Sequence, residues 1–381
     1  MNQKVSSIIT SVRFPLAVMV VYVHSFGEGN VIISKIDWRS FSFENLYDVI
    51  RVLVSGTISG IAVPSFFLIS GYLFFQGLEN WNWGIWRTKI TRRIHTLMIP
   101  YLIWNVLRFL FNVLTMGALF IHGHRMEQFK VWLSENTDLF ALWAMPATGM
   151  PVHTPFWFIR DLIVLVVLSP LSYFFFKKKI IGRIVMGTLL ILYVGHLLPT
   201  IPGFSISGLL FFNLGCWLAI GKGKYLMRSL SKSGGAILVL SLLLIMLSVV
   251  SFGTTYNQYI IPWMVIFTIF AFYNLFCCII LADKMNIPSY FGDASFFIFA
   301  FHMFLIITGG LMVDFLNIPK AENPILKTLQ FLVIPPFVAF ACAWIHLLLK
   351  RSMPKLCTIL DGKLQVAFSV KKCFYYYQKN K

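Results

Sequence analysis

Apolar residues fill this chain in long runs, and short polar segments separate the runs. A run of about 20 apolar residues is long enough for a helix to cross the hydrocarbon layer of a membrane. Ten runs reach or approach that length, over residues 8–26, 50–75, 94–120, 157–176, 180–198, 204–220, 235–252, 259–281, 294–315 and 326–349. The pattern predicts an all-α, polytopic membrane helix bundle with about ten transmembrane helices, and an even number of crossings leaves both termini on one side.

The composition agrees with a membrane protein. Hydrophobic residues make up 58% of the chain and charged residues 12%, which excludes a soluble globule because a water-facing surface needs far more charge. We expect one transmembrane domain over residues 1–349 and a basic tail over residues 350–381, held to anionic lipid. The six cysteines form no C-x-x-C pair, and no cleavable signal peptide is expected.

The chain has a net charge of +18, and its basic residues are distributed as expected for a membrane protein. Basic residues concentrate at 87–93, 177–183 and 222–232 and after residue 349, whereas the alternate connecting segments hold fewer cations and mix them with acidic residues. Cytoplasmic loops of membrane proteins carry this excess of lysine and arginine. The distribution therefore predicts cytoplasmic termini and membrane lipid as a partner, and it argues against nucleic acid.

Two polar residues, Arg13 and His24, interrupt the first apolar run. A charge near the centre of a transmembrane helix costs roughly 2.5–3.5 kcal/mol. Eleven residues return to within roughly 20° of the same helix face after a rise of about 16 Å, and a kink at Pro15 makes this alignment approximate. Two such groups on one face indicate a polar cavity inside the bundle.

A basic cluster precedes the third apolar run, where Lys89, Arg92 and Arg93 lie at the expected cytoplasmic boundary. Such a cluster is usually a topology signal. Together with Arg13 it would also form a cup for a polyphosphate, because guanidinium groups bind phosphate oxygens in pairs.

The outer start of the fourth run carries the adjacent residues Arg160 and Asp161. Neighbours on a helix point about 100° apart, so we expect that they cannot simply neutralise one another and that at least one has a partner elsewhere. At the depth of His24, a carboxylate can orient an imidazole and an arginine can stabilise an oxyanion. An interhelical salt bridge is the structural alternative. His302, halfway along the ninth run, fits a structural role better than a catalytic one.

Two long connections, over residues 27–49 and 121–156, are expected on the outer face. Their tryptophans, including Trp132 and Trp143, are typical of anchors at the membrane surface, and a cap over a substrate site is the alternative. His122 and His124 have no carboxylate partner nearby, so no metal site is expected there.

Several sequence blocks resemble those of a known family. Arg13 and His24 form an R-x10-H pair, and VPSFFLISGYL, RRIHTLMIPYLIWN, TPFWFIRDLIVLVVLSPL, FFNLGCWLAIGKGK and SFFIFAFHMF follow in order. The set resembles the acyltransferase-3 family of bacterial integral-membrane O-acyltransferases over nearly the whole chain, in its stand-alone type. Phe299 and Ala300 depart from the Tyr and Leu that relatives often carry there.

The resemblance implies a multi-pass protein of the bacterial cytoplasmic (inner) membrane, an acyl-CoA donor on the cytoplasmic side, and a sugar, lipid-linked glycan or other envelope acceptor. It also implies that His24 is the catalytic histidine and Arg13 its essential partner.

Our hypothesis from the sequence is a membrane O-acyltransferase with acyl-CoA, preferably acetyl-CoA, as co-substrate and with no permanently bound cofactor or metal. Arg13, Lys89, Arg92 and Arg93 would bind the coenzyme A phosphates. His24 would accept the proton of the acceptor hydroxyl, or would form an acyl-histidine, and Arg160 and Asp161 are further catalytic candidates. A transporter or flippase of an envelope precursor and a sensor subunit are the alternatives. The acceptor, the acyl chain and the oligomeric state stay open.

Overall fold

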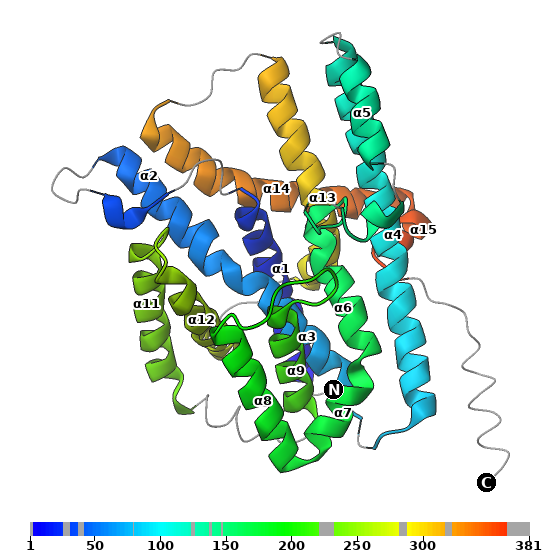
Figure 1. Ribbon diagram of the computed structural model, residues 1–381, viewed down its shortest axis with the longest axis vertical. Coiled ribbons are helices and arrows are strands. Elements are labelled where there is room, and N and C mark those ends of the chain that lie inside the picture. The colour runs from blue at the N-terminus through cyan, green and yellow to red at the C-terminus, as the bar shows by residue number, and fades with distance from the viewer. Residues whose placement is uncertain are drawn as a thin grey trace.

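The computed structural model describes residues 3–25, 31–36, 42–78, 80–122, 126–136, 139–145, 148–220, 232–281, 288–316 and 322–363. These residues form a bundle of helices with no named strand, apart from an isolated bridge between Ile201 and Phe204. Figure 1 shows the bundle, in which the first residues, the start of α4 and the α7–α8 turn lie at the same end. The predicted all-α class is confirmed for this part of the chain.

Each of the ten apolar runs is helical. The corresponding elements are α1 (Gln3–Val23), α2 (Phe43–Arg51) with η3 (Val52–Thr57), η4 (Ile58–Ile61) and α3 (Ala62–Phe75), α4 (Trp83–His122), α6 (Trp157–Val167) with α7 (Ser169–Lys177), α8 (Lys179–Val194), α9 (Ile206–Ala219), α11 (Gly234–Val250), α12 (Asn257–Leu281), α13 (Ser289–Phe315) and α14 (Pro324–Ser352). Shorter helices are η1 (Ile33–Lys35), α5 (Met126–Asn136), η5 (Leu139–Leu142), η6 (Thr154–Phe156) and α15 (Pro354–Leu360).

Five helical stretches are long and apolar enough to cross a membrane within the described residues, namely Phe43–Phe75, Trp83–Ala118, Asn257–Ile279, Ser289–Phe315 and Pro324–Ser352. The bent pair α6–α7 gives a sixth, with an angle of 57° between its halves. The bend is at Leu168, just before a proline in the first turn of α7, which lacks the N–H needed to continue a straight helix. Shorter apolar helices cover Ser7–Val23, Ile206–Ala219 and Gly234–Val250. The number ten and the side of the termini stay predictions.

The outer surface of the bundle is apolar. Large side chains such as Leu114 on α4, Ile180 on α8 and Phe337 on α14 are each more than 65% exposed. A soluble protein rarely exposes so much contiguous apolar area. This surface therefore fits contact with lipid.

Close packing places α1 and α3 inside the bundle. α1 contacts α3, α12, α13 and α14, and its residues Val12, Leu16 and Ala17 are fully buried. α3 crosses α9 so closely that a Cβ at Gly71 would clash with the backbone oxygen of Phe212. Small residues permit such backbone contact between membrane helices. The two inner helices then direct their few polar side chains into the bundle.

Candidate active site

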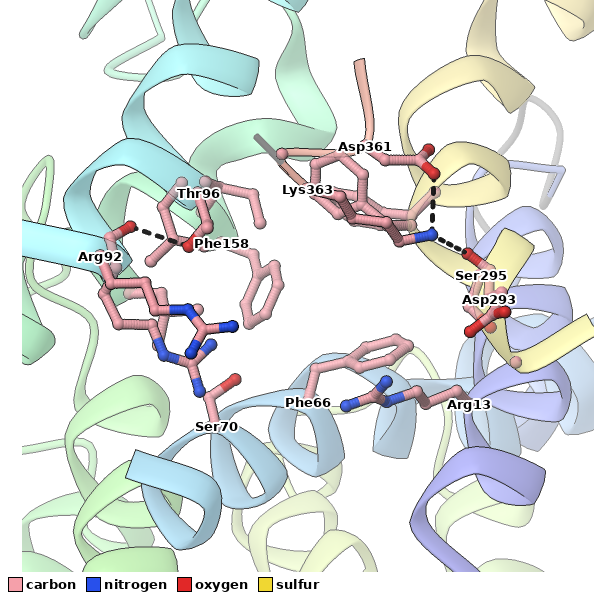
Figure 2. A pocket seen from close by; sticks show the side chains of 18 residues that line it. Arg13, Phe66, Ser70, Arg92, Thr96, Phe158, Asp293, Ser295, Asp361 and Lys363 are labelled. Atoms are coloured by element: carbon pink, nitrogen blue, oxygen red, sulfur yellow. Dashed lines mark hydrogen bonds and ion pairs between the residues drawn. The ribbon is translucent and has the colours of Figure 1, made fainter. Parts of the chain in front are cut away.

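A cavity of about 480 Å³ opens between α1, α3, α4, α6, α13 and the segment after α15. Figure 2 shows Arg13 reaching into it from α1, with Arg92 on the facing side and Phe66 and Phe158 between them. The other residues along its wall are Ser70, Arg93, Thr96, Leu97, Ile159, Leu162, Gly292, Asp293, Ser295, Phe296, Phe299, Asp361, Gly362 and Lys363. Charged side chains and phenylalanines thus both contribute to the cavity wall.

Three guanidinium groups share this cavity. Arg92 and Arg93 lie on the third turn of α4, and Arg93 has both Arg92 and Arg13 as electrostatic neighbours. Asp293 is the acidic neighbour of Arg13. Like charges at close range repel each other unless an anion lies among them, and phosphate is the anion that the planar guanidinium fits best. The arrangement can therefore hold a polyphosphate.

Lys89 has Arg93 as an electrostatic neighbour but does not line the cavity. Its Nζ donates a hydrogen bond to the carbonyl oxygen of Phe74 at 2.8 Å and lies 5.8 Å from the centre of the Phe74 ring. It connects the start of α4 to the end of α3.

His24 lies against a second histidine. α1 ends at Val23, so His24 stands in the turn that follows, with its backbone N–H 3.3 Å from Val20 O. Its ring centroid is 5.2 Å from that of His302 on α13. His302 Nδ1 lies 3.1 Å from the carbonyl oxygen of Ile298, and a carbonyl accepts only from a protonated nitrogen. The buried Nε2 of His302 is then a free proton acceptor, without a hydrogen-bond partner in the described part of the chain.

A third imidazole, that of His153, approaches from the loop before η6. It is completely buried, its backbone N–H donates to Asn105 Oδ1 at 2.9 Å, and its Nε2 lies 2.9 Å from Ala300 O. His24 and His302 are among its electrostatic neighbours. His24, His302 and His153, which we call the histidine cluster, bring proton-accepting groups together from three distant parts of the chain.

Phenylalanine rings connect the cavity wall to His153 of the histidine cluster. Phe299 lines the cavity, stacks on Phe156 with a centroid distance of 5.5 Å, and meets the edge of Phe158 at 5.7 Å. His302 follows Phe299 by three residues on the same helix, which is less than one turn. Ring contacts therefore lead from Phe299 in the cavity wall through Phe156 to His153.

The expectation that Arg13 and His24 face one pocket stays a prediction. Arg13 lines the cavity, whereas His24 is not among its lining residues. His24 continues the backbone hydrogen bonding of α1, since its N–H bonds to Val20 O four residues earlier, and its ring lies against His302.

Comparison with known proteins assigns the family. A family model described as an acyltransferase domain matches residues 8–347. The chain belongs to the acyltransferase-3 family. Its family and its several apolar helices indicate a multi-pass membrane protein. The transporter and sensor hypotheses are thereby disfavoured.

One curated relative is the succinoglycan biosynthesis protein ExoH of Rhizobium meliloti (strain 1021), which is 28% identical over 219 residues. The match covers 56% of this chain and 53% of the relative, so the chain spans about half the length of the protein it matches. No solved structure matches.

In this acyltransferase-3 member, Arg160 and Asp161 bond to each other. Arg160 Nε lies 3.2 Å from Asp161 Oδ1, and both side chains are buried. The expectation that they cannot neutralise one another was wrong, because the long arginine side chain bends back to its neighbour. Arg160 also donates to Trp143 O at 2.9 Å and Gly149 O at 2.8 Å. It therefore holds the loop that leads to His153.

Near the end of the described chain, His346, Cys357 and Asp361 place possible metal-ligand atoms within 4.8 Å of one another. His346 Nε2 and Lys363 Nζ both bond to Asp361 Oδ2, at 2.9 and 2.8 Å, and these bonds account for the geometry. His124 and the His122 side chain lie outside the described residues.

Sequence reasoning missed several residues of this acyltransferase site. His153 was treated as part of an outer loop, although it directly precedes the TPFWFIRD block. Asp361 and Lys363 were assigned to a lipid-bound tail, although the sequence Asp-Gly-Lys is typical of a turn.

Proposed function

We propose that this acyltransferase moves an acyl group, preferably acetyl, from acyl-CoA to a hydroxyl of an envelope polysaccharide or its glycan precursor. The observation that carries the proposal is the convergence of Arg13, Arg92 and Arg93 in a cavity whose wall residue Phe299 is connected through Phe156 to the histidine cluster. The ExoH relative, named for succinoglycan biosynthesis, supports a polysaccharide acceptor.

The donor site follows from charge and size. Coenzyme A carries a diphosphate and a ribose phosphate, and the three guanidinium groups supply the charge-assisted hydrogen bonds that such groups need. A cavity of about 480 Å³ is in the usual range for small-molecule sites. It is suited to the phosphate-bearing half of the donor, so the pantetheine arm has to continue past Phe299 toward the histidine cluster.

The transfer step uses His24 as the base. Its unprotonated ring nitrogen takes the proton of the acceptor hydroxyl while the oxygen attacks the thioester carbonyl carbon. The carbon–sulfur bond then breaks, and the coenzyme A thiolate takes the proton back from the imidazolium. An acyl-histidine intermediate is the alternative route. His302, whose ring lies against His24, orients the base in either case.

Arg160 and Asp161 act on the outer side as positioning residues rather than as catalytic ones. Arg160 fixes two carbonyl groups of the loop before His153, and Asp161 fixes Arg160. We therefore propose that this pair determines the shape of the acceptor-binding side of the site.

The experiment is a transfer assay with purified protein in lipid nanodiscs, labelled acetyl-CoA and the host polysaccharide. His24→Ala should abolish label transfer while a matched substitution, His196→Asn, leaves it unchanged, because His196 lines neither the cavity nor the histidine cluster. Transfer retained by a folded His24→Ala protein would remove His24 from the mechanism. No transfer by the wild-type protein from any acyl-CoA would remove the proposed donor.

A further inference from the structure

The segment after α14 is built into the donor cavity. α15 and the three residues after it turn back toward α4, where Trp104 Nε1 donates to Leu360 O at 3.1 Å. Gly362 has φ of +66° and lies so close to Thr96 O that a Cβ would clash with it. We call residues 354–363 the closing segment. It lies beyond residue 347, where the match to the family model ends.

The closing segment places a cation in the cavity wall. Lys363 Nζ donates to Asp361 Oδ2 at 2.8 Å and to Asp293 O at 3.3 Å. The same oxygen of Asp361 is 2.9 Å from His346 Nε2 on α14. Asp361 is buried, whereas the Lys363 side chain is 49% exposed. Two oxygen acceptors thus hold the ammonium group of Lys363 at the cavity surface, where a ligand can reach it.

One of these acceptors, the carboxylate of Asp361, is ionised. Burial alone raises the pKa of Asp361, but hydrogen bonds from His346 and Lys363 outweigh it and hold the pKa below its ordinary value of 3.8. Asp361 is therefore charged at neutral pH and directs Lys363.

Cations now line the cavity from two sides. Figure 2 shows Lys363 and Arg13 across the open space from Arg92. Asp293 and Asp361 offset part of this charge, and the four cations leave a positive excess. A ligand that satisfies both sides needs two separate anionic groups. Coenzyme A has them, since its ribose phosphate is attached apart from its diphosphate.

We propose that Lys363 binds the ribose phosphate of the acyl-CoA donor, while Arg13, Arg92 and Arg93 bind its diphosphate. The closing segment then selects coenzyme A over thioesters that lack this phosphate. This inference rests on the proposed function, because it assigns one more contact to the same donor.

The test compares two donors, acetyl-CoA and acetyl-dephospho-CoA, in the nanodisc assay. Lys363→Ala should raise KM about tenfold for acetyl-CoA, as expected for the loss of one charge-assisted hydrogen bond, and should leave KM for acetyl-dephospho-CoA unchanged. Lys363→Arg should restore most of the loss. Lys355→Ala is the matched control, since Lys355 is an exposed lysine of α15 that does not line the cavity.

The outcomes separate the inference from the proposed function. An equal change for both donors, or no change for acetyl-CoA, overturns the assignment of Lys363 and leaves the proposed function standing. If Lys363 bound a lipid phosphate instead, Lys363→Ala would change the rates with both donors equally, and this result would also overturn the assignment. If the wild-type protein transfers nothing from acetyl-CoA, both the inference and the proposed function fail.

Discussion

Arg13 offers the sharpest test of the donor site, because its charge and its hydrogen-bonding geometry can be removed separately. Arg13→Gln removes the charge. Arg13→Lys keeps the charge and loses the planar fork that binds two phosphate oxygens. Both replacements leave α1 with an unbranched polar side chain at this position, so the packing of Val12 and Leu16 in the core should be preserved.

The expected magnitudes follow from the contacts. A hydrogen bond to a charged group is worth about 1.5–3 kcal/mol, and every 1.4 kcal/mol is about a factor of ten. Arg13→Gln should therefore raise KM for acetyl-CoA by about 10- to 150-fold. Arg13→Lys should raise it by less, about 3- to 10-fold, because one bond and the charge remain.

Asp293 makes the prediction sharper. This exposed carboxylate is the acidic neighbour of Arg13, so it repels the donor phosphates once Arg13 is gone. Adding Asp293→Asn to Arg13→Gln should lower KM again by about threefold, a modest effect because water in the cavity screens the charge. Purely structural damage at Arg13 would not be relieved by a second substitution.

The assay is the initial rate of acetyl transfer as a function of acetyl-CoA concentration, with the thermal midpoint of each variant as the folding control. A wild-type KM in a folded Arg13→Gln protein would refute the phosphate-binding role of Arg13. A KM that Asp293→Asn does not lower would refute the electrostatic reasoning.

Three further outcomes are expected. Gly215→Ala should destabilise the protein by about 1–3 kcal/mol, because the new Cβ would clash with Leu68 O; an unchanged thermal midpoint would contradict the close crossing of α3 and α9. His302→Gln should lower kcat at least about tenfold, change the pH profile of kcat and leave KM for acetyl-CoA unchanged, whereas an effect on KM alone would argue against its orienting role. The lowered pKa of Asp361 contributes stability that is present above the ordinary pKa of 3.8 and is lost as pH falls through the folded-state pKa. As pH falls below about 4, the thermal midpoint of Asp361→Asn should therefore decrease less than that of the wild type. An equal decrease in both proteins would contradict this prediction.

The helices themselves were predictable from the sequence, because each depends on a local run of apolar residues. The runs over residues 94–120 and 326–349 are helical as expected, and α4 and α14 extend beyond them at both ends. The proximity of Arg13 to Arg92 and Arg93 was also predictable, since all three were expected near one membrane boundary. The bend at Leu168 also has a local cause, the proline in the first turn of α7, whereas the exact helix ends depend on how each helix packs.

The rest of the site depends on tertiary contacts that no local pattern encodes. His24, His302 and His153 are far apart in the chain, and only the packing of α1 against α13 and the loop brings them together. Arg160 and Asp161 illustrate a different limit, because helix geometry fixes Cβ directions and not the reach of a long side chain. Lys363 looked like part of a lipid-binding tail because its role depends on a turn at Gly362 that fits against α4.

The central claim is that one donor molecule extends from the arginines of the cavity, past Phe299, to His24. The most direct measurement is a cryo-EM structure of the protein in nanodiscs with a non-hydrolysable acetyl-CoA analogue. We predict that its phosphates lie within hydrogen-bond distance of Arg13, Arg92 and Arg93, that Phe299 has turned aside, and that the acetyl carbonyl lies beside the His24 ring. An analogue bound on another face, or one whose acetyl group stays in the cavity behind a closed Phe299, would contradict the claim.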